Sequence, residues 1–525
     1  MFSVWRFLAF PTVIFTLYLY LYPIVHDCNF PPARRAEAAC YIDPKSAQDG
    51  RSEEVAPFRL LALGDPQLEG DTSLPDPNAP AFPSLDALRE DVFSIPSKLS
   101  VGSVTTALSG VIANDLPAIF QAYRKRLDLL GNDYYLAHVY RSVRWWADPT
   151  HTVVLGDLLG SQWIDDEEFS RRSDRFWNRV FAGSTRVPEE VTSGVGRHVE
   201  VLNDVQGLVW RNRLINVAGN HDIGYAGDLD DHRIERFQRT FGPVNWAIEF
   251  SLLTNYSMSA ASPFPSSNAL SPRLRLVVLN SMNMDSPAWN EDLQRQTRDF
   301  LRDQGDATAT QGPGLANVLL THVPLHKDAG ICVDGPFFDY FPEHNRGGIS
   351  EQNHLSLDSS EFILQTLFPI EIPSERRHGR RGVILNGHDH EGCDTVHYVS
   401  GGVAQTEEEL VSDGTWQVEH TRRGYSRLGD GSHAIREITV RSMMGYFGGN
   451  AGLLSAWFDE AAGEWKFEYA SCIFGIQHIW WAVHVLLLIF VLLSITMIPI
   501  ALIDSRSDRA QGQMEQKSLE SKKRL

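Results

Sequence analysis

Five short polar clusters along the chain contain residue types that bind divalent metals or phosphate. They read Asp65-Pro66-Gln67, Gly156-Asp157, Gly219-Asn220-His221-Asp222, Thr321-His322 and Gly387-His388-Asp389-His390. Carboxylate, amide and imidazole groups together suit manganese, iron or zinc. The side chains of Asp65, Asp157, Asn220, His322, His388 and His390 are more donors than one tetrahedral zinc site accepts. They predict two metals that share a bridging carboxylate and leave room for water and a phosphoester.

A short apolar run precedes each cluster. These runs are Phe58–Leu63, Thr152–Leu155, Leu214–Ala218, Asn317–Leu320 and Val383–Leu385. Runs of this length and composition are typical of buried strands. Helical patterns lie between some of them, at Leu116–Leu130 and His232–Phe241, and late strands are predicted at Glu437–Ser442 and Leu453–Phe458. The alternation predicts an α/β sheet with its functional groups at the carboxyl ends of the strands.

Each cluster alone has a simpler interpretation. A single Gly-Asp after a strand is usually a turn, and Asn-His-Asp can form an Asx turn in a loop. Five clusters in this order, each after an apolar run, are hard to obtain by accident. The joint pattern therefore favours a metal centre.

The ordered series resembles the calcineurin-like metallophosphoesterases, whose signature is D-x-H, G-D, G-N-H-D/E, a single His and G-H-x-H. The resemblance extends from about Phe58 to Glu468. It implies a four-layer αββα sandwich. It also implies that Asp157 bridges two metals, that Asp65 and His390 bind the first, and that Asn220, His322 and His388 bind the second. His221 would contact the phosphate or protonate the leaving oxygen, and Asp222 would orient His221.

Gln67 departs from this signature, because the family usually has His at that position. A Gln carbonyl oxygen is a weaker, neutral ligand. The substitution leaves open a loosely held first metal and, beyond that, a weakly catalytic protein.

Further residues resemble one eukaryotic branch of the family, the GPI ethanolamine-phosphate phosphodiesterases. These are the segments 65–70 and 131–141, and the pairs Gly347-Gly348 and Gln352-Asn353. The branch implies removal of ethanolamine phosphate from a mannose of the GPI glycan, with manganese as the metal. It implies GPI-anchored proteins or the GPI lipid as substrate, and export of those proteins by cargo receptors. Two alternatives stay open: a phosphatase or phosphodiesterase for another lipid, glycan or nucleotide, and a sorting scaffold.

The charge distribution indicates a membrane protein. The chain of 525 residues has 47 Lys and Arg against 66 Asp and Glu, which argues against a nucleic-acid partner. Two runs with almost no charge, Val4–Val25 and Ile476–Ile503, are long enough to cross a bilayer. We predict an uncleaved first anchor rather than a signal peptide. The basic tail then places both termini in the cytosol and the acidic middle in the lumen.

These segments predict five regions: an anchor (1–25), a linker (26–56), the catalytic domain (57–472), a membrane helix (473–503) and a cytosolic tail (504–525). Lys522 and Lys523 resemble a dilysine signal that coat proteins read, which implies an endoplasmic reticulum membrane protein that cycles to the early Golgi. Asn255 begins an N-x-S sequon, a candidate lumenal glycosylation site. Pairing among the five cysteines stays open.

Two further segments are ambiguous. The tract Tyr134–Trp146 offers Tyr134 and Arg141 as contacts to a phosphodiester, but a helix that packs its aromatic face on the sheet is the favoured interpretation. Residues Ala329–Arg381 form a long insertion before the last cluster. Such an insertion is either a wall of the site or a decoration without a catalytic role.

Overall fold

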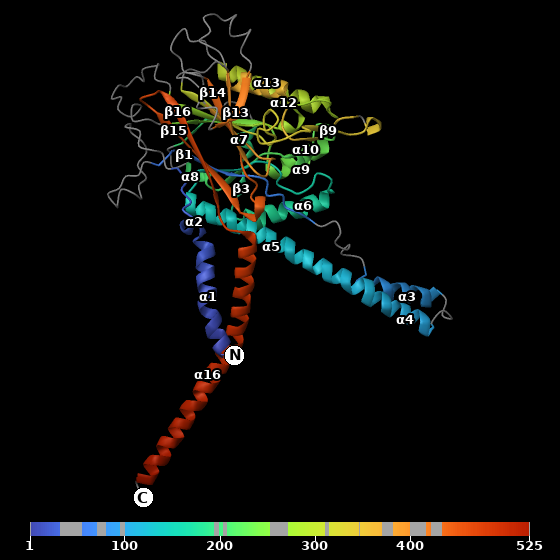
Figure 1. Ribbon diagram of the computed structural model, residues 1–525, viewed down its shortest axis with the longest axis vertical. Coiled ribbons are helices and arrows are strands. Elements are labelled where there is room, and N and C mark those ends of the chain that lie inside the picture. Colours follow the sequence, from blue (N-terminus) through green and yellow to red (C-terminus); the bar gives the residue numbers. More distant parts are fainter. Residues whose placement is uncertain are drawn as a thin grey trace, which may run out of the picture. The chain divides into compact units, whose positions relative to one another are not determined.

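The computed structural model describes residues 2–31, 55–70, 80–94, 100–193, 199–202, 207–252, 271–309, 314–345, 347–369, 382–399, 416–421 and 433–523 (Figure 1). The chain divides into two compact units. The larger comprises residues 29–446 and 450–472, and the smaller comprises residues 1–28, 447–449 and 473–525. Each unit is described by itself.

The larger unit contains two sheets. The first has six strands in the order β16 (Glu464–Ile473), β15 (Asn450–Asp459), β1 (Phe58–Leu63), β2 (His151–Val154), β5 (Arg213–Asn216) and β3 (Thr185–Arg186). The second has eight in the order β13 (Trp416–His420), β12 (Cys393–Val399), β14 (Ala434–Thr439), β11 (Gly382–Asn386), β8 (Leu315–Leu320), β7 (Arg273–Val278), β6 (Trp246–Ser251) and β4 (Val199–Val201). A hairpin of β9 (Phe338–Tyr340) and β10 (Ile349–Gln352) is separate.

The two sheets bury one apolar core between them. Phe58 of β1 and Phe250 of β6 belong to it, with ring centroids 5.9 Å apart, although they lie in different sheets. Burying such large side chains is the main favourable term in folding, at roughly 1.5–3 kcal/mol for each. Because this unit contains both sheets and helices, the predicted α/β class is confirmed as a mixed α/β fold.

Helices pack on the sheets from outside. Asn216 of β5 donates to the Phe241 carbonyl of α10 (Asp231–Phe241), and Asn317 of β8 donates to the Leu367 carbonyl of α13 (Leu357–Leu367). The other long helices are α5 (Leu116–Ala147), α6 (Asp166–Arg175) and α12 (Glu291–Ala309). Before α5 lie α3 (Pro83–Ser94), α4 (Val101–Gly110) and the π-helical turn η3 (Val111–Asp115). Short helices are η4 (Phe176–Val180), α7 (Glu189–Thr192), α8 (Gly207–Trp210), α9 (Asn220–Ile223), η5 (Ser281–Asn283), η6 (Glu343–Asn345) and η8 (Gly445–Phe447).

The structure confirms the predicted strands within a few residues, but it corrects their arrangement. The resemblance implied an αββα sandwich with two sheets, whereas the alternation of strands and helices by itself predicted one sheet that carries all five clusters. Instead β1, β2 and β5 belong to the six-stranded sheet, whereas β8 and β11 belong to the eight-stranded sheet. The two late strands also separate, since β14 and β15 lie in different sheets. Apolar periodicity identifies a buried strand but contains no information about which sheet it joins.

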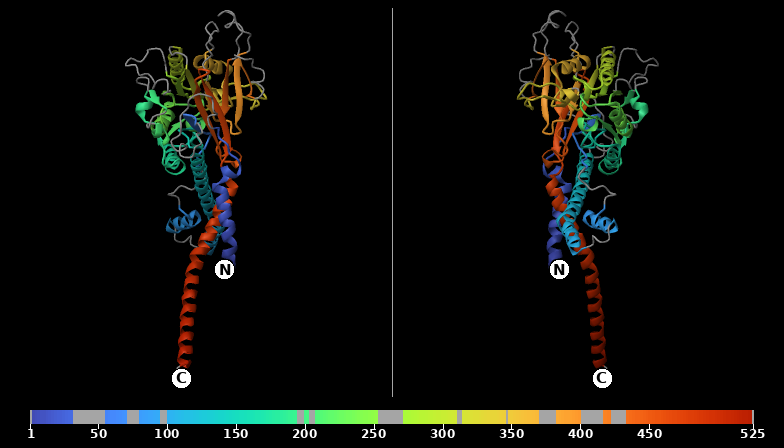
Figure 2. Two further views of the ribbon diagram at one scale, coloured as in Figure 1. Left: turned by 90° about the vertical axis from the view of Figure 1, so that its left-hand side faces the viewer. Right: turned by 90° about the vertical axis from the view of Figure 1, so that its right-hand side faces the viewer.

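The smaller unit contains α1 (Phe2–Tyr20), α2 (Tyr22–Val25) and the 47-residue α16 (Gln477–Lys523). The helices α1 and α16 run alongside each other (Figure 2). Trp5 of α1 donates to the Ser494 hydroxyl of α16 at 2.8 Å. Within the described residues, the one helix long and apolar enough to cross a membrane is Gln477–Met497.

The expectation of two spanning helices is therefore not confirmed. Non-helical backbone at Leu21 interrupts the first run before Pro23, and the apolar helical stretch is only Trp5–Tyr20. A helix rises 1.5 Å per residue, so that stretch measures about 24 Å against a hydrocarbon core of about 30 Å.

A buried ion pair joins β14 to the loop after β8. Lys327 donates to Glu437 at 2.9 Å, and both side chains are almost fully buried. Burial alone would raise the pKa of Glu437, but Lys327 and His397 hold it well below its ordinary value. Glu437 also accepts from the Leu325 amide and from the Asn386 side chain. The loops that bear His322 and His388 are thus fastened to one carboxylate.

We predict that Lys327→Met lowers the free energy of unfolding by about 3–5 kcal/mol, because it leaves the Glu437 charge buried without its partner. Denaturant titration of the purified protein measures this. The matched control, Arg302→Met, removes an exposed pair with Asp299 and should cost at most about 0.5 kcal/mol. Equal losses in the two variants would contradict the prediction.

Candidate metal centre

The five clusters lie at the carboxyl ends of strands from both sheets. Parallel pairing of β1, β2 and β5 brings together the loops of Asp65, Asp157 and Asn220. Parallel pairing of β8 and β11 does the same for the loops of His322 and His388. The two edges then meet, since the His322 Nδ1–H donates to the Leu155 carbonyl across the sheets at 2.7 Å.

Asp65, Asp157 and His322 form the buried centre of the site. One candidate ligand atom from each lies within 4.8 Å of the others, and all three residues are at most 1% exposed. His322 Nε2 lies 3.3 Å from Asp157 Oδ1 and 3.0 Å from Asn220 Oδ1. Oδ2 of Asp65 is buried and has no hydrogen-bond partner among the described residues. An unpaired buried carboxylate oxygen is costly, so this donor set fits a bound cation.

Hydrogen bonds set the ring orientations of both histidines. Because Nδ1 of His322 donates to a carbonyl, its Nε2 is left with a lone pair that faces Asp157. In His388 the roles are reversed: Nε2–H donates to the Gln352 carbonyl at 2.8 Å, which leaves Nδ1 facing Asn220 Oδ1 at 3.1 Å. Such bonds to the far nitrogen are typical of metal-binding imidazoles.

The electrostatics favour neutral imidazoles beside a charged Asp157, whereas Asp65 is shifted toward its protonated form. Enclosure in the site and the nearby His322 lower the pKa of His388 to about 3. Burial also lowers the pKa of His322. Burial alone would raise the pKa of Asp157, but His322 and His221 bring it below its ordinary value. Burial and the Asp157 charge raise the pKa of Asp65, so two adjacent carboxylates lack enough positive charge from the protein itself.

Left-handed backbone is concentrated in these loops. Asp65, Gln67, Asp157 and His388 have φ of 40°, 41°, 48° and 73°. Each such residue costs of order 1–3 kcal/mol, and surrounding structure must hold it in place. Gly156, with φ of 95°, is the tightest position, because a Cβ there would lie 2.2 Å from His322 Nδ1. The loops are therefore shaped around the imidazole.

Asp222 has a different task from the predicted one. Its carboxylate accepts from the amides of Leu158, Leu159 and Gly219 at 3.1, 2.9 and 2.9 Å. It therefore ties the Asp157 loop to the Asn220 loop. The prediction that Asp222 orients His221 is wrong, since both carboxylate oxygens are engaged by backbone and His221 Nδ1 has no hydrogen-bond partner among the described residues.

His221 and His390 lie at the accessible rim of the centre. The His221 amide donates to Asp157 Oδ1 at 2.9 Å, and its half-exposed ring places Nε2 3.8 Å from Asp157 Oδ2. The Gln67 amide nitrogen lies 3.0 Å from Asp157 Oδ2 and 3.2 Å from His390 Nε2. The structure thus brings all the sequence-predicted metal ligands together, while their roles as ligands stay a prediction.

The insertion at 329–381 packs on the site through its hairpin. The Gln352 carbonyl accepts from His388, and Gly227 and Ile349 join the hairpin to the loop after α9 at 2.9 Å. A Cβ on Gly227 would lie 2.4 Å from the Ile349 carbonyl oxygen. Asp285 holds the end of β10 by accepting from the Gln352 side chain. This favours a wall of the site over a decoration.

Sequence reasoning missed the roles of Gln352 and Asp285. Gln352 was singled out as part of a motif, but its contribution is a backbone carbonyl, which any residue type has. Asp285 follows no predicted strand. No sequence signal could therefore have assigned either one to the site.

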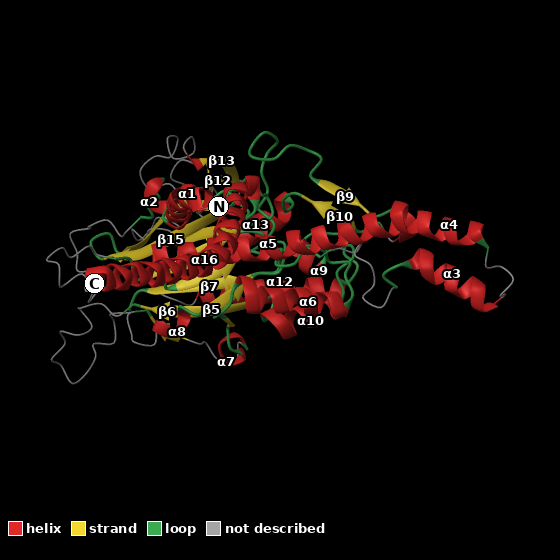
Figure 3. Ribbon diagram, turned by 90° about the horizontal axis from the view of Figure 1, so that it is seen from below, coloured by secondary structure: helices red, strands yellow, loops and turns green. Residues whose placement is uncertain are grey.

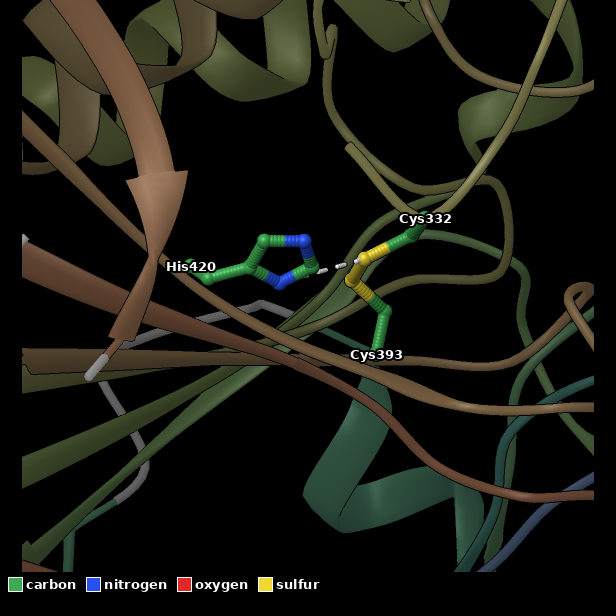
Figure 4. A group of neighbouring side chains, drawn as sticks. All are labelled: Cys332, Cys393 and His420. Atoms are coloured by element: carbon green, nitrogen blue, oxygen red, sulfur yellow. Dashed lines mark hydrogen bonds between the residues drawn. A yellow bond between two sulfur atoms is a disulfide. The ribbon is translucent and has the colours of Figure 1, made fainter. Parts of the chain in front are cut away.

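A disulfide fastens the insertion from its other end. Cys332 pairs with Cys393, 61 residues later, and the His420 ring lies beside Cys332 (Figure 4). Cys393 follows the His388–His390 loop directly and begins β12. Cys28 and Cys472 also each form a disulfide. Cys40, the remaining cysteine, lies outside the described residues.

The other predicted site residues lie elsewhere. Tyr134 and Arg141 are on the exposed side of α5, whereas Tyr135 and Tyr140 are buried on its inner side. This agrees with the interpretation of α5 as a packing helix. Among the described residues, no hydrogen bond or ion pair joins Tyr134 or Arg141 to the metal centre, and their role as substrate contacts stays a prediction. The sequon at Asn255 lies outside the described residues.

Comparison with known proteins finds related chains. Over 92% of its length the chain is 28% identical to Protein TED1 of Saccharomyces cerevisiae, with 95% of that protein covered. Over 52% of its length it is 25% identical to Metallophosphoesterase 1 of Xenopus laevis, with 58% covered. The chain is therefore a phosphoester hydrolase related to the metallophosphoesterases, and its Asp and His cluster is where metal ions would bind.

No family model matches this chain. A dimetal phosphatase from Danio rerio is similar over 66% of this chain and 90% of that one, at 12% identity and a TM-score of 0.29. That score is too low to support an argument about the fold.

We predict that Asp222→Ala lowers the metal affinity about 10- to 100-fold, because the Asp157 and Asn220 loops lose their common anchor. Metal content after equilibration at a series of free metal concentrations measures this. Asp166→Ala, which removes an exposed carboxylate from α6, is the control and should retain wild-type affinity. Unchanged metal binding in Asp222→Ala would contradict the role of Asp222.

A second prediction concerns Gln67. In Gln67→His an imidazole replaces an amide next to Asp157 and His390. Of the two metal ions expected per chain, the more weakly held one should therefore bind at least about tenfold more tightly than in the wild type. Calorimetric titration with Mn²⁺ measures this, and Gln67→Ala is the matched control that removes the amide without adding a ligand. No difference between the two variants would show that position 67 does not face a metal.

Proposed function

We propose that the chain is a membrane-anchored phosphodiesterase that removes ethanolamine phosphate from a mannose of the GPI glycan. The observation that carries this is the buried set of carboxylate, amide and imidazole donors where the two sheets meet. The sequence resemblance to the GPI ethanolamine-phosphate phosphodiesterase branch supports the substrate. The similarity to Metallophosphoesterase 1 supports the reaction class.

The residues fit two divalent metals, and manganese is our choice, with iron and zinc as alternatives. Asp157 would bridge them, Asp65 and His390 would hold the first with Gln67 beside it, and Asn220, His322 and His388 would hold the second. Two such ions, when bound, neutralise phosphoryl oxygens and activate water for in-line attack.

The protein's own groups do the remaining work. The half-exposed His221 ring lies next to Asp157 and can donate a proton to the leaving mannose oxygen. Its Nδ1 has no hydrogen-bond partner among the described residues, and its Nε2 lies 3.8 Å from Asp157 Oδ2, so no short hydrogen bond fixes the ring. The hairpin that contains Gln352 walls the site and restricts what enters beside His388.

The proposed location in the cell rests on the apolar helix near the C-terminus. The apolar helix Gln477–Met497 and its contact with α1 support an integral membrane protein with a retained N-terminal segment. We propose that the larger unit is lumenal, that both termini are cytosolic, and that the chain resides in the endoplasmic reticulum membrane and cycles to the early Golgi. Coat proteins would bind Lys522 and Lys523, and cargo receptors would receive the trimmed GPI-anchored proteins.

Gln67 favours a second candidate function, a weakly catalytic sorting scaffold of the same family. Metal analysis separates the two, because a scaffold needs no stoichiometric metal. A substrate panel separates the GPI glycan from other lipid, glycan or nucleotide phosphoesters.

The test is the structure of GPI glycans in cells that lack the protein. We expect ethanolamine phosphate to be retained on one defined mannose, and mass spectrometry of released glycans measures this. Wild-type chain should restore trimming, whereas Asp157→Asn should reduce it by at least about a thousandfold, since the bridging charge is lost.

Asp166→Asn is the control for expression and folding, since it removes a carboxylate of the same chemistry from an exposed helix. Normal glycans in cells without the protein would overturn the substrate. Full restoration by Asp157→Asn would overturn the metal-bridging role.

A further inference from the structure

The outer side of α5 exposes a row of large apolar side chains, called here the α5 stripe. Its members are Leu116, Phe120, Tyr123, Leu127, Leu130 and Tyr134 at three- or four-residue intervals, and Trp145 further along the same side. Their exposed fractions lie between 40% and 78%. We propose that the α5 stripe lies on the surface of a lipid bilayer, with neighbouring arginines on the phosphate groups of the lipids.

The spacing puts these residues on one side of the helix. They follow one another mostly at three- or four-residue intervals, which confines them to an arc of about 80° on a helix with 3.6 residues per turn. The opposite side of the C-terminal half is buried, as Tyr135 and Val139 show. This helix is therefore apolar on its outer side as well as its inner one, which a helix facing only water is not.

The stripe continues beyond the core of the unit. Helices α4 and α5 follow each other with only η3 between them and extend past the sheets, with α3 beside α4 (Figures 1 and 3). Ser84 of α3 donates to Asp115 through its amide and hydroxyl, at 3.1 and 3.0 Å. Exposed Leu108 and Ile112 prolong the apolar surface onto α4 and η3.

The charges beside the stripe point to lipid rather than to a protein groove. Arg124 and Arg126 flank it at about 80° to either side, and Arg141 lies on it. All three are exposed, and none forms an ion pair with a described residue. The stripe itself contains no acidic residue. Apolar and aromatic side chains edged by arginines are typical of helices that lie in a membrane interface, where the arginines can contact lipid phosphates.

The chain also contains the helix Gln477–Met497, which is long and apolar enough to cross a membrane. The inference rests on the proposed membrane anchoring. It does not depend on which phosphoester is cleaved. A helix held in the interface would limit how the metal centre can turn relative to a membrane-borne glycan.

The test uses the full chain in vesicles of phosphatidylcholine with phosphatidylserine. A photo-crosslinking amino acid replaces Leu127 in one sample and Gln121, exposed about 120° further round the same helix, in the control. We expect at least about fivefold more lipid adduct from position 127. Equal lipid adducts at the two positions, or crosslinks from 127 only to protein or to a second copy, would overturn the proposal.

A paired variant tests the charge. Arg124→Gln with Arg126→Gln should reduce the lipid adduct from position 127 at least about threefold in these vesicles. Arg295→Gln with Arg302→Gln removes two exposed arginines from α12 and should change nothing. Equal adducts from both pairs would show that the arginines do not hold α5 on the lipid and would overturn their role in the proposal. Crosslinking does not measure catalysis, so these results stand apart from the GPI assay.

Discussion

Two carboxylates buried side by side, Asp65 and Asp157, are the constraint on which the site depends. Neither can be charged in a low-dielectric interior without nearby positive charge, and the surrounding imidazoles are pushed toward their neutral forms. Divalent cations would resolve that conflict. The Asp65 Oδ2 atom, which has no hydrogen-bond partner among the described residues, marks a point where a cation would stabilise the buried carboxylate.

The same constraint explains why the loops of the site adopt unfavourable backbone conformations. Asp65, Asp157 and His388 all have left-handed conformations, which aim short side chains inward from loops that would otherwise turn away. Asp222 and Glu437 stabilise this arrangement from behind, one by joining two loops of the six-stranded sheet and the other by joining two loops of the eight-stranded sheet. Neither needs to touch a substrate to be essential for the geometry.

The substrate side of the site is built from a different part of the chain. The hairpin of β9 and β10 contacts the centre through the Gln352 carbonyl and is restrained by the Cys332–Cys393 disulfide. The metal centre therefore belongs to the two-sheet core, while the wall beside it belongs to an insertion. The α5 stripe is a third element. In our proposal it affects how the site is positioned at a membrane and takes no part in the reaction.

The sequence by itself determined the strands of the site and which polar residues follow them, because potential ligand types after apolar runs are local signals. It also determined the apolar helix near the C-terminus. Only the tertiary structure decided that the clusters divide between two sheets, that Asp222 binds backbone instead of His221, and that Gln352 contributes a carbonyl. It also decided that Leu21 interrupts the first apolar run. Each of these depends on contacts between residues far apart in the chain or on local backbone geometry, neither of which residue type records.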